Sequence, residues 1–551
     1  MLNMNKLIIS TVLALSVSVS TYAEDVTLVV KKHGQDKFET IVVDGSEVEQ
    51  IKNSNLYLSV EEEVWLSRPE LKIKPLDKVN QLKPKNILKS KSMSATSTEF
   101  TPNDPDFSFQ YYFSEKSDQP GSSEILQAVR KSEKNKKLRI AVLDGGFHDH
   151  EDLEYLYGYN FFGQWGEVRS AEFRDFEDEV SEATGCISGH GLSIASIIGA
   201  KSNNEIGISG VIDADLIALR VLSCGIGPLS DLSDAIIHAA GGEVDDIPVI
   251  EKVDMINISI SGPVGSCPTY VQEAIDFANE QGVMIFVAAG NNNEDISTYA
   301  PAICDGVYVS GATDKQGYKA EFSNHGELNS MSPGVDIVGY SASYSEGEII
   351  TQLGWWEGTS QASPLTAAIA GLGLQHDPKL TTEEIFTYLK VTSDDIRDDV
   401  LNADQDCSLE QCGSGLINAS RFMDLVIAFD SETKFELNHA LADDSNCDQE
   451  LFISEFGNSL KLCEMYELVM PDNFSELQGD ITLVRALKND ELIEENIEEV
   501  IEVSDSTMLL DAIDLDTYQY ATKICLNYTC EVSKLIELDI TKAISPLSCQ
   551  K

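Results

Sequence analysis

The chain has 551 residues, with 92 acidic and 39 basic side chains and a formal net charge of −53. Hydrophobic residues form 42% of it, a normal share for globular protein, which excludes global disorder and fibrous architectures. The acidic balance argues against nucleic acid as a partner, because phosphates require a basic surface, and against an anionic membrane surface. The same charge disfavours self-association, so we expect a monomer.

The N-terminus has the features of a secretory signal. Lys6 precedes an apolar run over residues 7–19, and Thr21-Tyr-Ala23 places small residues at the two positions that signal peptidase reads. The alternative is a membrane anchor, but the run is shorter than the roughly 20 residues that span a bilayer. We therefore expect residues 1–23 to be removed and the protein to be secreted, extracellular or periplasmic, without membrane insertion.

Two segments flank a long central region. Residues 24–100 begin with short alternating runs, typical of a small α+β unit, and end in a Lys/Ser/Thr-rich linker over residues 89–98. Residues 430–551 contain strand-like runs among acidic turns, which predict a separate β-rich domain.

Residues 101–429 predict an α/β domain. Apolar runs alternate there with helical patterns, and strands that are almost continuously apolar favour a parallel sheet covered by helices on both faces. The runs lie at residues 138–143, 217–222, 253–258 and 283–288.

Three polar residues of this domain are candidates for catalysis. Asp144 directly follows an apolar strand, His190 lies between glycines where a small-residue helix begins, and Ser360 opens a second such helix. Each has an ordinary alternative, namely a loop-capping acid, an incidental histidine and a helix-capping serine. Together they supply an orienting acid, a base and a nucleophile, with the positive end of a helix at the nucleophile.

The three segments resemble the subtilisin-like serine peptidases, in that family's chain order of Asp, His and Ser. The motif Gly358-Thr-Ser360-Gln-Ala-Ser-Pro364 is close to the family's serine signature, and the resemblance covers residues 101–425. It implies that Asp144, His190 and Ser360 form the triad. Val287-Ala-Ala-Gly-Asn291 looks like the oxyanion segment, so the resemblance implies the Asn291 side chain and the Ser360 amide as donors.

The resemblance also implies a substrate pocket, although its side-chain preference stays open. The base of that pocket falls in residues 295–301, and Tyr299, if it fills the pocket, predicts a preference for small side chains. The residues expected to bind substrate are Ser259, Ile260, Ser261, Gly262 and Gly290.

Two segments depart from the family pattern. The family usually has Thr where this chain has Gly145, and its His segment usually continues Gly-Thr-His-Val-Ala-Gly where this chain has Gly191-Leu-Ser-Ile-Ala-Ser196. Neither change removes a catalytic atom, so we expect activity.

Calcium is a further implication of the resemblance. Thr101-Pro-Asn-Asp104-Pro looks like the start of thermitase-like members, and Asp104, Asp152 and Asn204 match ligand positions. Oxygen ligands from separate segments suit this hard cation. The alternative is solvated loop acids, which are common in so acidic a chain.

Eleven cysteines agree with an oxidising compartment, and an odd number leaves at least one unpaired or intermolecular. By analogy with secreted members we expect the pairs Cys186–Cys224 and Cys267–Cys304. Cys407 and Cys412 are close enough to close a small loop.

We therefore expect a secreted, calcium-supported serine endopeptidase made as a zymogen. Its partners would be protein or peptide substrates and its own prosegment, residues 24–100, acting as an inhibitor. The alternative is a catalytically silent binding or adhesion protein of the same fold, in which the C-terminal domain does the work. Whether that domain is a substrate-binding module or a folding or secretion aid stays open.

Overall fold

A computed structural model describes residues 25–67, 74–75 and 100–428, together with strands between 435 and 539. Gaps within these ranges lie at residues 36, 165–167, 175–188, 246, 346–347, 398–406 and 408. The chain divides into two compact units at Glu63 and Val64. The predicted signal lies outside the described residues.

The N-terminal unit is a three-stranded antiparallel sheet with one short helix. The strand order is β2-β1-β3, and Leu28, Val30 and Val48 form its small core. The elements are β1 (Asp25–Lys32), β2 (Phe38–Asp44), α1 (Val48–Lys52) and β3 (Tyr57–Glu62).

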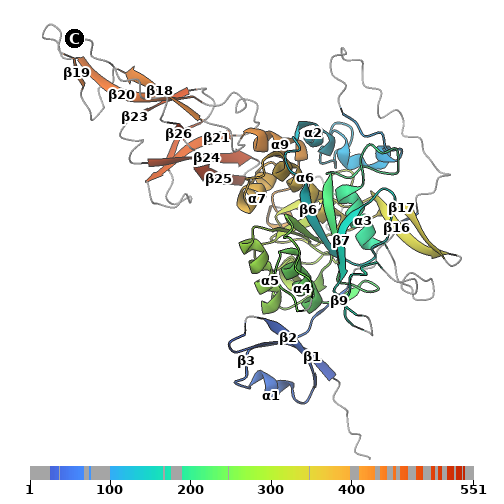
Figure 1. Ribbon diagram of the computed structural model, residues 1–551. Helices are drawn as coiled ribbons and strands as arrows, with labels where there is room; N and C mark the ends of the chain where they lie inside the picture. The colour runs from blue at the N-terminus through green and yellow to red at the C-terminus, as the bar shows by residue number, and fades with distance from the viewer. Residues whose placement is uncertain are drawn as a thin grey trace, which may run out of the picture. The chain divides into compact units, whose positions relative to one another are not determined.

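A seven-stranded sheet forms the centre of the second unit, and every strand pair in it is parallel (Figure 1). Its order is β15-β14-β12-β10-β6-β8-β7, so β6, the first of these seven strands along the chain, lies inside the sheet. The strands are β6 (Leu138–Asp144), β7 (Tyr155–Asn160), β8 (Ala214–Arg220), β10 (Met255–Ile258), β12 (Met284–Ala288), β14 (Tyr308–Thr313) and β15 (Ser330–Pro333). All four predicted strand runs are confirmed.

Helices cover both faces of this sheet (Figure 1). On one face α3 packs against α6, and Ile140 and Val142 of β6 join their core; on the other face α4 packs against α5. Alternate residues of a strand point to opposite faces of the sheet. Because helices cover both faces, every position of such a strand is buried, which explains why the strand sequences are apolar throughout. The helices are α2 (Ile125–Lys131), α3 (His190–Gly199), α4 (Leu229–Ala239), α5 (Thr269–Glu280), α6 (Thr359–His376), α7 (Thr382–Val391), α8 (Leu409–Cys412) and α9 (Ala419–Ala428).

Short strands lie outside the main sheet. β4 (Trp65–Ser67) pairs with β9 (Ile226–Pro228), and β11 (Gly262–Pro263) pairs with β13 (Tyr299–Ala300). A hairpin of β16 (Ile337–Ser345) and β17 (Glu348–Trp356) takes β5 (Lys74–Pro75) as a third strand. Three 3-10 turns lie at Phe107–Phe109, Tyr111–Phe113 and Ile296–Thr298.

The C-terminal region contains two further groups of strands and, in its described part, no helix. One sheet has the order β19-β20-β18-β26 with β23 added to β20, and the other has the order β22-β21-β24-β25. The bounds are β18 (Phe435–Ala442), β19 (Leu451–Ile453), β20 (Leu460–Val469), β21 (Asp480–Leu487), β22 (Glu498–Glu502), β23 (Thr507–Asp511), β24 (Tyr518–Leu526), β25 (Thr529–Leu535) and β26 (Leu538–Asp539).

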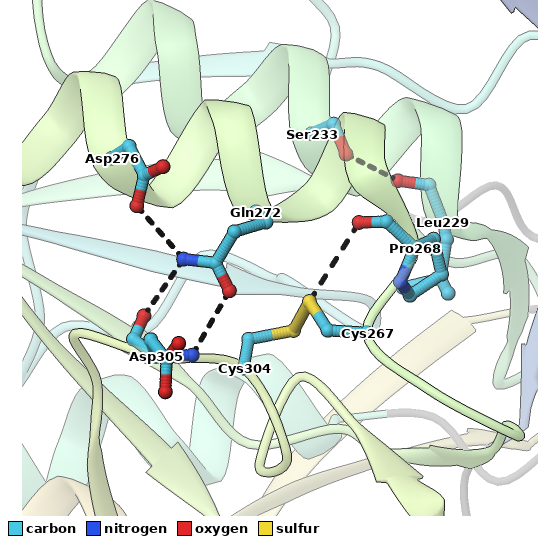
Figure 2. The surroundings of a disulfide bond; sticks show 8 residues. All are labelled: Leu229, Ser233, Cys267, Pro268, Gln272, Asp276, Cys304 and Asp305. Carbon is cyan, nitrogen blue, oxygen red and sulfur yellow. Dashed lines mark hydrogen bonds between the residues drawn. A yellow bond between two sulfur atoms is a disulfide. The ribbon is translucent and has the colours of Figure 1, made fainter. Parts of the chain in front are cut away.

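Two of the three predicted disulfides are present. Cys267–Cys304 joins the segment after β11 to the segment after β13, with Cα atoms 5.1 Å apart (Figure 2). Cys407–Cys412 closes a loop with a sequence separation of 5. Cys186 lies outside the described residues, so its pairing with Cys224 stays a prediction.

Candidate active site

The predicted catalytic residues gather where the parallel strands end. Asp144 is the last residue of β6, Ser259 follows β10, and Asn291 comes three residues after the end of β12. In an open α/β sheet this edge is where ligands bind, because loops from several strands meet there. The helices that begin with His190 and Thr359 start at the same edge.

Asp144 and His190 form a fully buried pair. His190 Nδ1 lies 2.8 Å from Oδ1 and 2.9 Å from Oδ2 of Asp144, and neither side chain is exposed. The Gly145 amide donates to Asp144 Oδ1 at 2.7 Å, which fixes the carboxylate. A carboxylate on Nδ1 leaves Nε2 as the nitrogen that can accept a proton.

Glycines let the loops that carry these two residues touch. The Gly191 amide donates to the Gly145 carbonyl at 2.7 Å, and the Leu192 amide donates to the Gly146 carbonyl at 3.2 Å. The first amides of α3 are thereby satisfied by the loop after β6. Gly146 has a φ of +80°, and a Cβ there would lie 2.7 Å from the Gly189 nitrogen. A side chain at this position would push the loops apart.

The departure at Gly145 also has a steric reason. A Cβ on Gly145 would lie 2.8 Å from the Leu222 carbonyl oxygen and 3.0 Å from the Leu222 Cβ. The threonine usual in the family has no room here unless the segment after β8 moves.

Ser360 lies in the first turn of α6 and is 2% exposed. Its hydroxyl donates to the Ser259 carbonyl at 2.9 Å. His190 Nε2 is buried and has no hydrogen-bond partner in the described part of the chain. Serine and histidine are thus not hydrogen-bonded to each other here, and a rotation of the Ser360 side chain is needed to join them, as is common when substrate is absent.

A buried hydrogen-bond chain holds the start of α6 against β10. Ser363 donates to Asn257 Oδ1 at 2.8 Å, Asn257 donates to the Ser259 hydroxyl at 2.9 Å, and that hydroxyl donates to the Ser360 carbonyl at 2.8 Å. Sequence reasoning assigned no role to Asn257 or Ser363. A polar residue within an otherwise apolar strand, as at Asn257, is the signal that could have found them.

Asn291 is oriented by the residue before Ser360. Its Oδ1 accepts from the Thr359 amide at 2.9 Å and from the Thr359 hydroxyl at 2.8 Å. The Thr359 hydroxyl in turn accepts from the Gly290 amide at 3.0 Å. With Oδ1 engaged, the Asn291 Nδ2 protons are left to donate elsewhere, next to the N-terminal amides of α6. Thr359 is a positioning residue that sequence reasoning missed.

The predicted substrate residues lie on two segments that meet beside Ser360, and Ile260 is buried between Ser259 and Ser261. Ser259 contacts Ser360 as described above. The Ser261 hydroxyl lies 3.1 Å from the position that a Cβ on Gly290 would take. Gly262 packs against Leu66 of β4, whose Cδ2 lies 3.0 Å from the corresponding Cβ position.

The three predicted calcium ligands also meet. The Asn204 side-chain amide donates to Asp152 Oδ1 at 2.6 Å, and the Asn204 backbone amide donates to Asp104 Oδ1 at 3.1 Å. Tyr340 donates to Asp152 Oδ2 at 2.6 Å. Asp104 is 5% exposed and Asp152 is fully buried. Burial raises the pKa of Asp152 to about 6, and the charge of Asp104 adds to the rise.

Comparison with known proteins gives a family. Residues 135–415 match the subtilase family. An extracellular protease of Xanthomonas campestris is 34% identical over 299 residues, which are 51% of this chain and 50% of that protein. Subtilisin BL of Lederbergia lenta is 30% identical over 285 residues, 51% of this chain and 89% of that protein. A solved protease structure from Pseudoalteromonas arctica has a TM-score of 0.53 at 30% identity, covering 59% of this chain and 100% of that one.

The chain therefore belongs to the subtilase family, as its three motifs predict. It spans about half the length of the Xanthomonas relative. Among the residues that the structure describes, none of the helices has the length and apolar content to cross a bilayer.

Proposed function

We propose that the protein is a secreted serine endopeptidase in which Ser360 is the nucleophile, His190 the base and Asp144 the orienting acid. The observation that carries this proposal is the buried Asp144–His190 pair, whose Nε2 is unpartnered within the described chain. The helix α3 that begins with His190 packs against α6, which carries Ser360. The name of the Xanthomonas relative supports an extracellular location.

The chemistry follows from the two ring nitrogens. Ser360 turns from the Ser259 carbonyl to His190 Nε2 and gives up its proton as its oxygen attacks a peptide carbonyl. Asp144 holds the tautomer and stabilises the imidazolium that forms. His190 then protonates the leaving amine, and an acyl-enzyme remains on Ser360. Water hydrolyses this ester with His190 again acting as base.

Charge develops on the carbonyl oxygen in both steps. The Asn291 Nδ2 protons and the Ser360 amide are the proposed donors to this oxyanion. The start of α6 adds the positive end of an 18-residue helix. Because Thr359 fixes Asn291 before substrate arrives, the donors need little reorganisation during the reaction.

A fluorophosphonate probe tests the nucleophile. We expect the processed protein to be labelled at Ser360 and to hydrolyse peptides, and Ser360→Ala to lose both properties with an unchanged thermal midpoint. Ser132→Ala is the matched control, since Ser132 bonds to the Leu372 carbonyl away from the site. A processed wild-type protein that neither labels nor hydrolyses peptides would favour a silent binding protein.

We further propose that residues 24–100 act as an inhibitory prosegment. Support comes from β4, which adds Trp65–Ser67 as an antiparallel strand to β9 and buries Leu66 to 1% exposure against Gly262. A strand at this place blocks residues proposed to bind substrate. Leu66→Ser in the full-length precursor should shorten the lag before activity appears. Leu58→Ser is the control, because Leu58 is 62% exposed; equal lags in both variants would contradict the proposal.

Calcium is the third proposal. The buried carboxylates of Asp104 and Asp152 are linked through Asn204, and within the described ranges neither forms an ion pair with Lys or Arg, so a cation fits the charge. Asp104, Asp152 and Asn204 would hold the ion. Asp104 accepts from two backbone amides and Asp152 accepts from Tyr340, Asn204 and the Ile208 amide, so each carboxylate keeps at least one lone pair for a cation. Asn204 would offer its side-chain oxygen, which accepts from the Ile206 amide. Bound calcium would neutralise these charges and stabilise the native state by mass action.

Chelation tests the calcium proposal. Removing calcium should lower the thermal midpoint of the mature protein by several degrees, because about 4 kcal/mol is at stake at a thousandfold excess over Kd. Asp104→Asn should lower the midpoint in calcium and reduce its response to chelator. Asp424→Asn, which alters a partly exposed ion pair to Lys131, is the control. An unchanged midpoint with no bound calcium would end the proposal.

A further inference from the structure

Two backbone segments form walls beside the nucleophile. One wall is residues 259–262, which begins at the carbonyl that accepts from Ser360. The other wall is Gly290, next to Asn291. The Ser261 hydroxyl reaches across between them, to 3.1 Å from where a Cβ on Gly290 would lie. The two walls therefore approach each other closely at Ser261 and Gly290.

Tyr299 is attached to the first wall through its backbone. β13 pairs antiparallel with β11, with Tyr299 opposite Pro263. The Val264 amide also donates to the Thr298 carbonyl at 2.7 Å. The backbone of Tyr299 is thus part of the same ribbon that continues the wall of residues 259–262.

The hydroxyl of Tyr299 is attached to the second wall. It donates to Glu294 Oε2 at 2.5 Å. The Glu294 backbone amide donates to Asn324 Oδ1 at 3.0 Å, and the Asn324 backbone amide donates to the Gly290 carbonyl at 3.0 Å. The backbone of Tyr299 is thus joined to one wall, and its hydroxyl is linked to the other wall through Glu294 and Asn324.

The ring is held firmly in this place. Tyr299 is 5% exposed, and its carbonyl accepts from the Ile303 amide at 2.8 Å. The Cys267–Cys304 disulfide ties the segment after β13 to the segment after β11, and Gln272 binds both the amide and the carbonyl of Asp305 (Figure 2). Burial and the Glu294 hydrogen bond raise the pKa of Tyr299 to about 12, so the hydroxyl remains a donor at neutral pH.

We propose that Tyr299 forms the floor and Ser261 the narrowed mouth of the acyl-side pocket, so that the enzyme cuts after small uncharged residues such as Gly, Ala or Ser. This inference rests on the proposed endopeptidase function. An aromatic or long aliphatic side chain has to displace a buried ring and break its bond to Glu294. An acidic side chain meets the Glu294 carboxylate.

The test compares peptides that differ only in the residue before the scissile bond. For the mature enzyme we expect kcat/KM to favour Ala over Phe by about 100-fold, within the range that steric exclusion from a pocket supplies. Tyr299→Gly should raise the Phe:Ala ratio of kcat/KM by about 100-fold. Tyr299→Phe keeps the ring and is the matched control, with a ratio that stays close to wild type.

Two measurements keep the inference separate from the proposed function. Fluorophosphonate labelling of Ser360 reports whether the catalytic centre is assembled, whichever peptide is cut. A labelled wild-type enzyme that cleaves after Phe as readily as after Ala overturns the inference alone. A wild-type protein with neither label nor hydrolysis overturns the proposed function and the inference with it. If Tyr299→Gly does not fold, Ser261→Gly decides, since it should raise the Phe:Ala ratio by opening the mouth.

Discussion

Two helices that pack on the central sheet, α3 and α4, each carry a fully buried histidine, His190 and His238. The hydrogen bonding of the two rings differs. His190 begins α3, with Asp144 on Nδ1 and no partner on Nε2. His238 lies near the end of α4, and neither ring nitrogen has a hydrogen-bond partner among the residues described. Three rings surround it, with centroids at 5.3 Å (Phe161), 5.8 Å (Tyr157) and 6.1 Å (Tyr159).

This difference shows that burial alone does not mark a histidine for catalysis. A base needs one nitrogen fixed by an acid and the other open towards the group it deprotonates, and only His190 has both. Burial without a partner has another consequence for His238: it lowers its pKa to about 4, which keeps the ring neutral over the physiological range. The first arrangement serves proton transfer and the second serves packing.

The largest expected effect comes from removing the acid that distinguishes His190. Asp144→Asn keeps the shape but favours the wrong tautomer of the imidazole, so kcat should fall by about 10⁴-fold with little change in thermal midpoint. The measurement is kcat for a peptide substrate after active-site titration. Asp231→Asn is the control, since Asp231 is also buried but pairs with Arg169 at 2.6 Å. If kcat of Asp144→Asn stays within tenfold of wild type, Asp144 does not orient His190 for catalysis.

The next effect concerns the charge that His190 helps to create on the substrate. Asn291→Ala removes one proposed oxyanion donor, and kcat should fall by about 10²- to 10³-fold while KM changes little. Asn279→Ala is the matched control, because the Asn279 side chain donates to the Gly306 carbonyl near the surface. Equal kcat values in the two variants would show that the α6 amides act without Asn291.

The sequence was sufficient to predict the parts of the site whose chemistry is local. Asp144, His190 and Ser360 each lie in a short motif beside glycines or a helix start, and the apolar runs predict the strands that carry the site. The family resemblance, and not local context, predicts that Asp104, Asp152 and Asn204 lie together.

Apart from the Cys267–Cys304 disulfide, which the family resemblance implies, contacts between distant segments were beyond that reasoning. The aromatic rings around His238 of α4 belong to Tyr157, Tyr159 and Phe161, which lie in or just after β7, about 80 positions earlier in the chain. Gly145 is required by Leu222, which belongs to another strand's loop. The link from Tyr299 through Glu294 to Gly290 depends on Asn324, which lies in a third segment. Such contacts are set by tertiary packing, and one sequence contains no local pattern for them.

The smallest effect is a pH-dependent one on stability, and it follows from His238. Folding lowers the pKa of His238 from 6.5 to about 4. Above pH 6.5 the ring is neutral in the folded and unfolded states, so its titration does not reduce the free energy of unfolding there. As pH falls from 6.5 to 4, the imidazole binds a proton in the unfolded chain but stays neutral in the native state. The free energy of unfolding therefore decreases by up to about 3 kcal/mol.

Two buried acids act in the opposite direction, so a difference measurement is needed. Burial raises the pKa of Asp152 and of Asp231 to about 6, and their cost to the native state falls as they are protonated. We therefore compare the free energy of unfolding of wild type and His238→Phe at each pH. The difference should move by about 3 kcal/mol in favour of the variant between pH 6.5 and 4. Tyr157→Phe is the control, because it keeps the histidine and should have the same pH dependence as wild type. If the difference in unfolding free energy between wild type and His238→Phe does not change with pH, the protonated ring must find a hydrogen-bond partner or solvent in the native state.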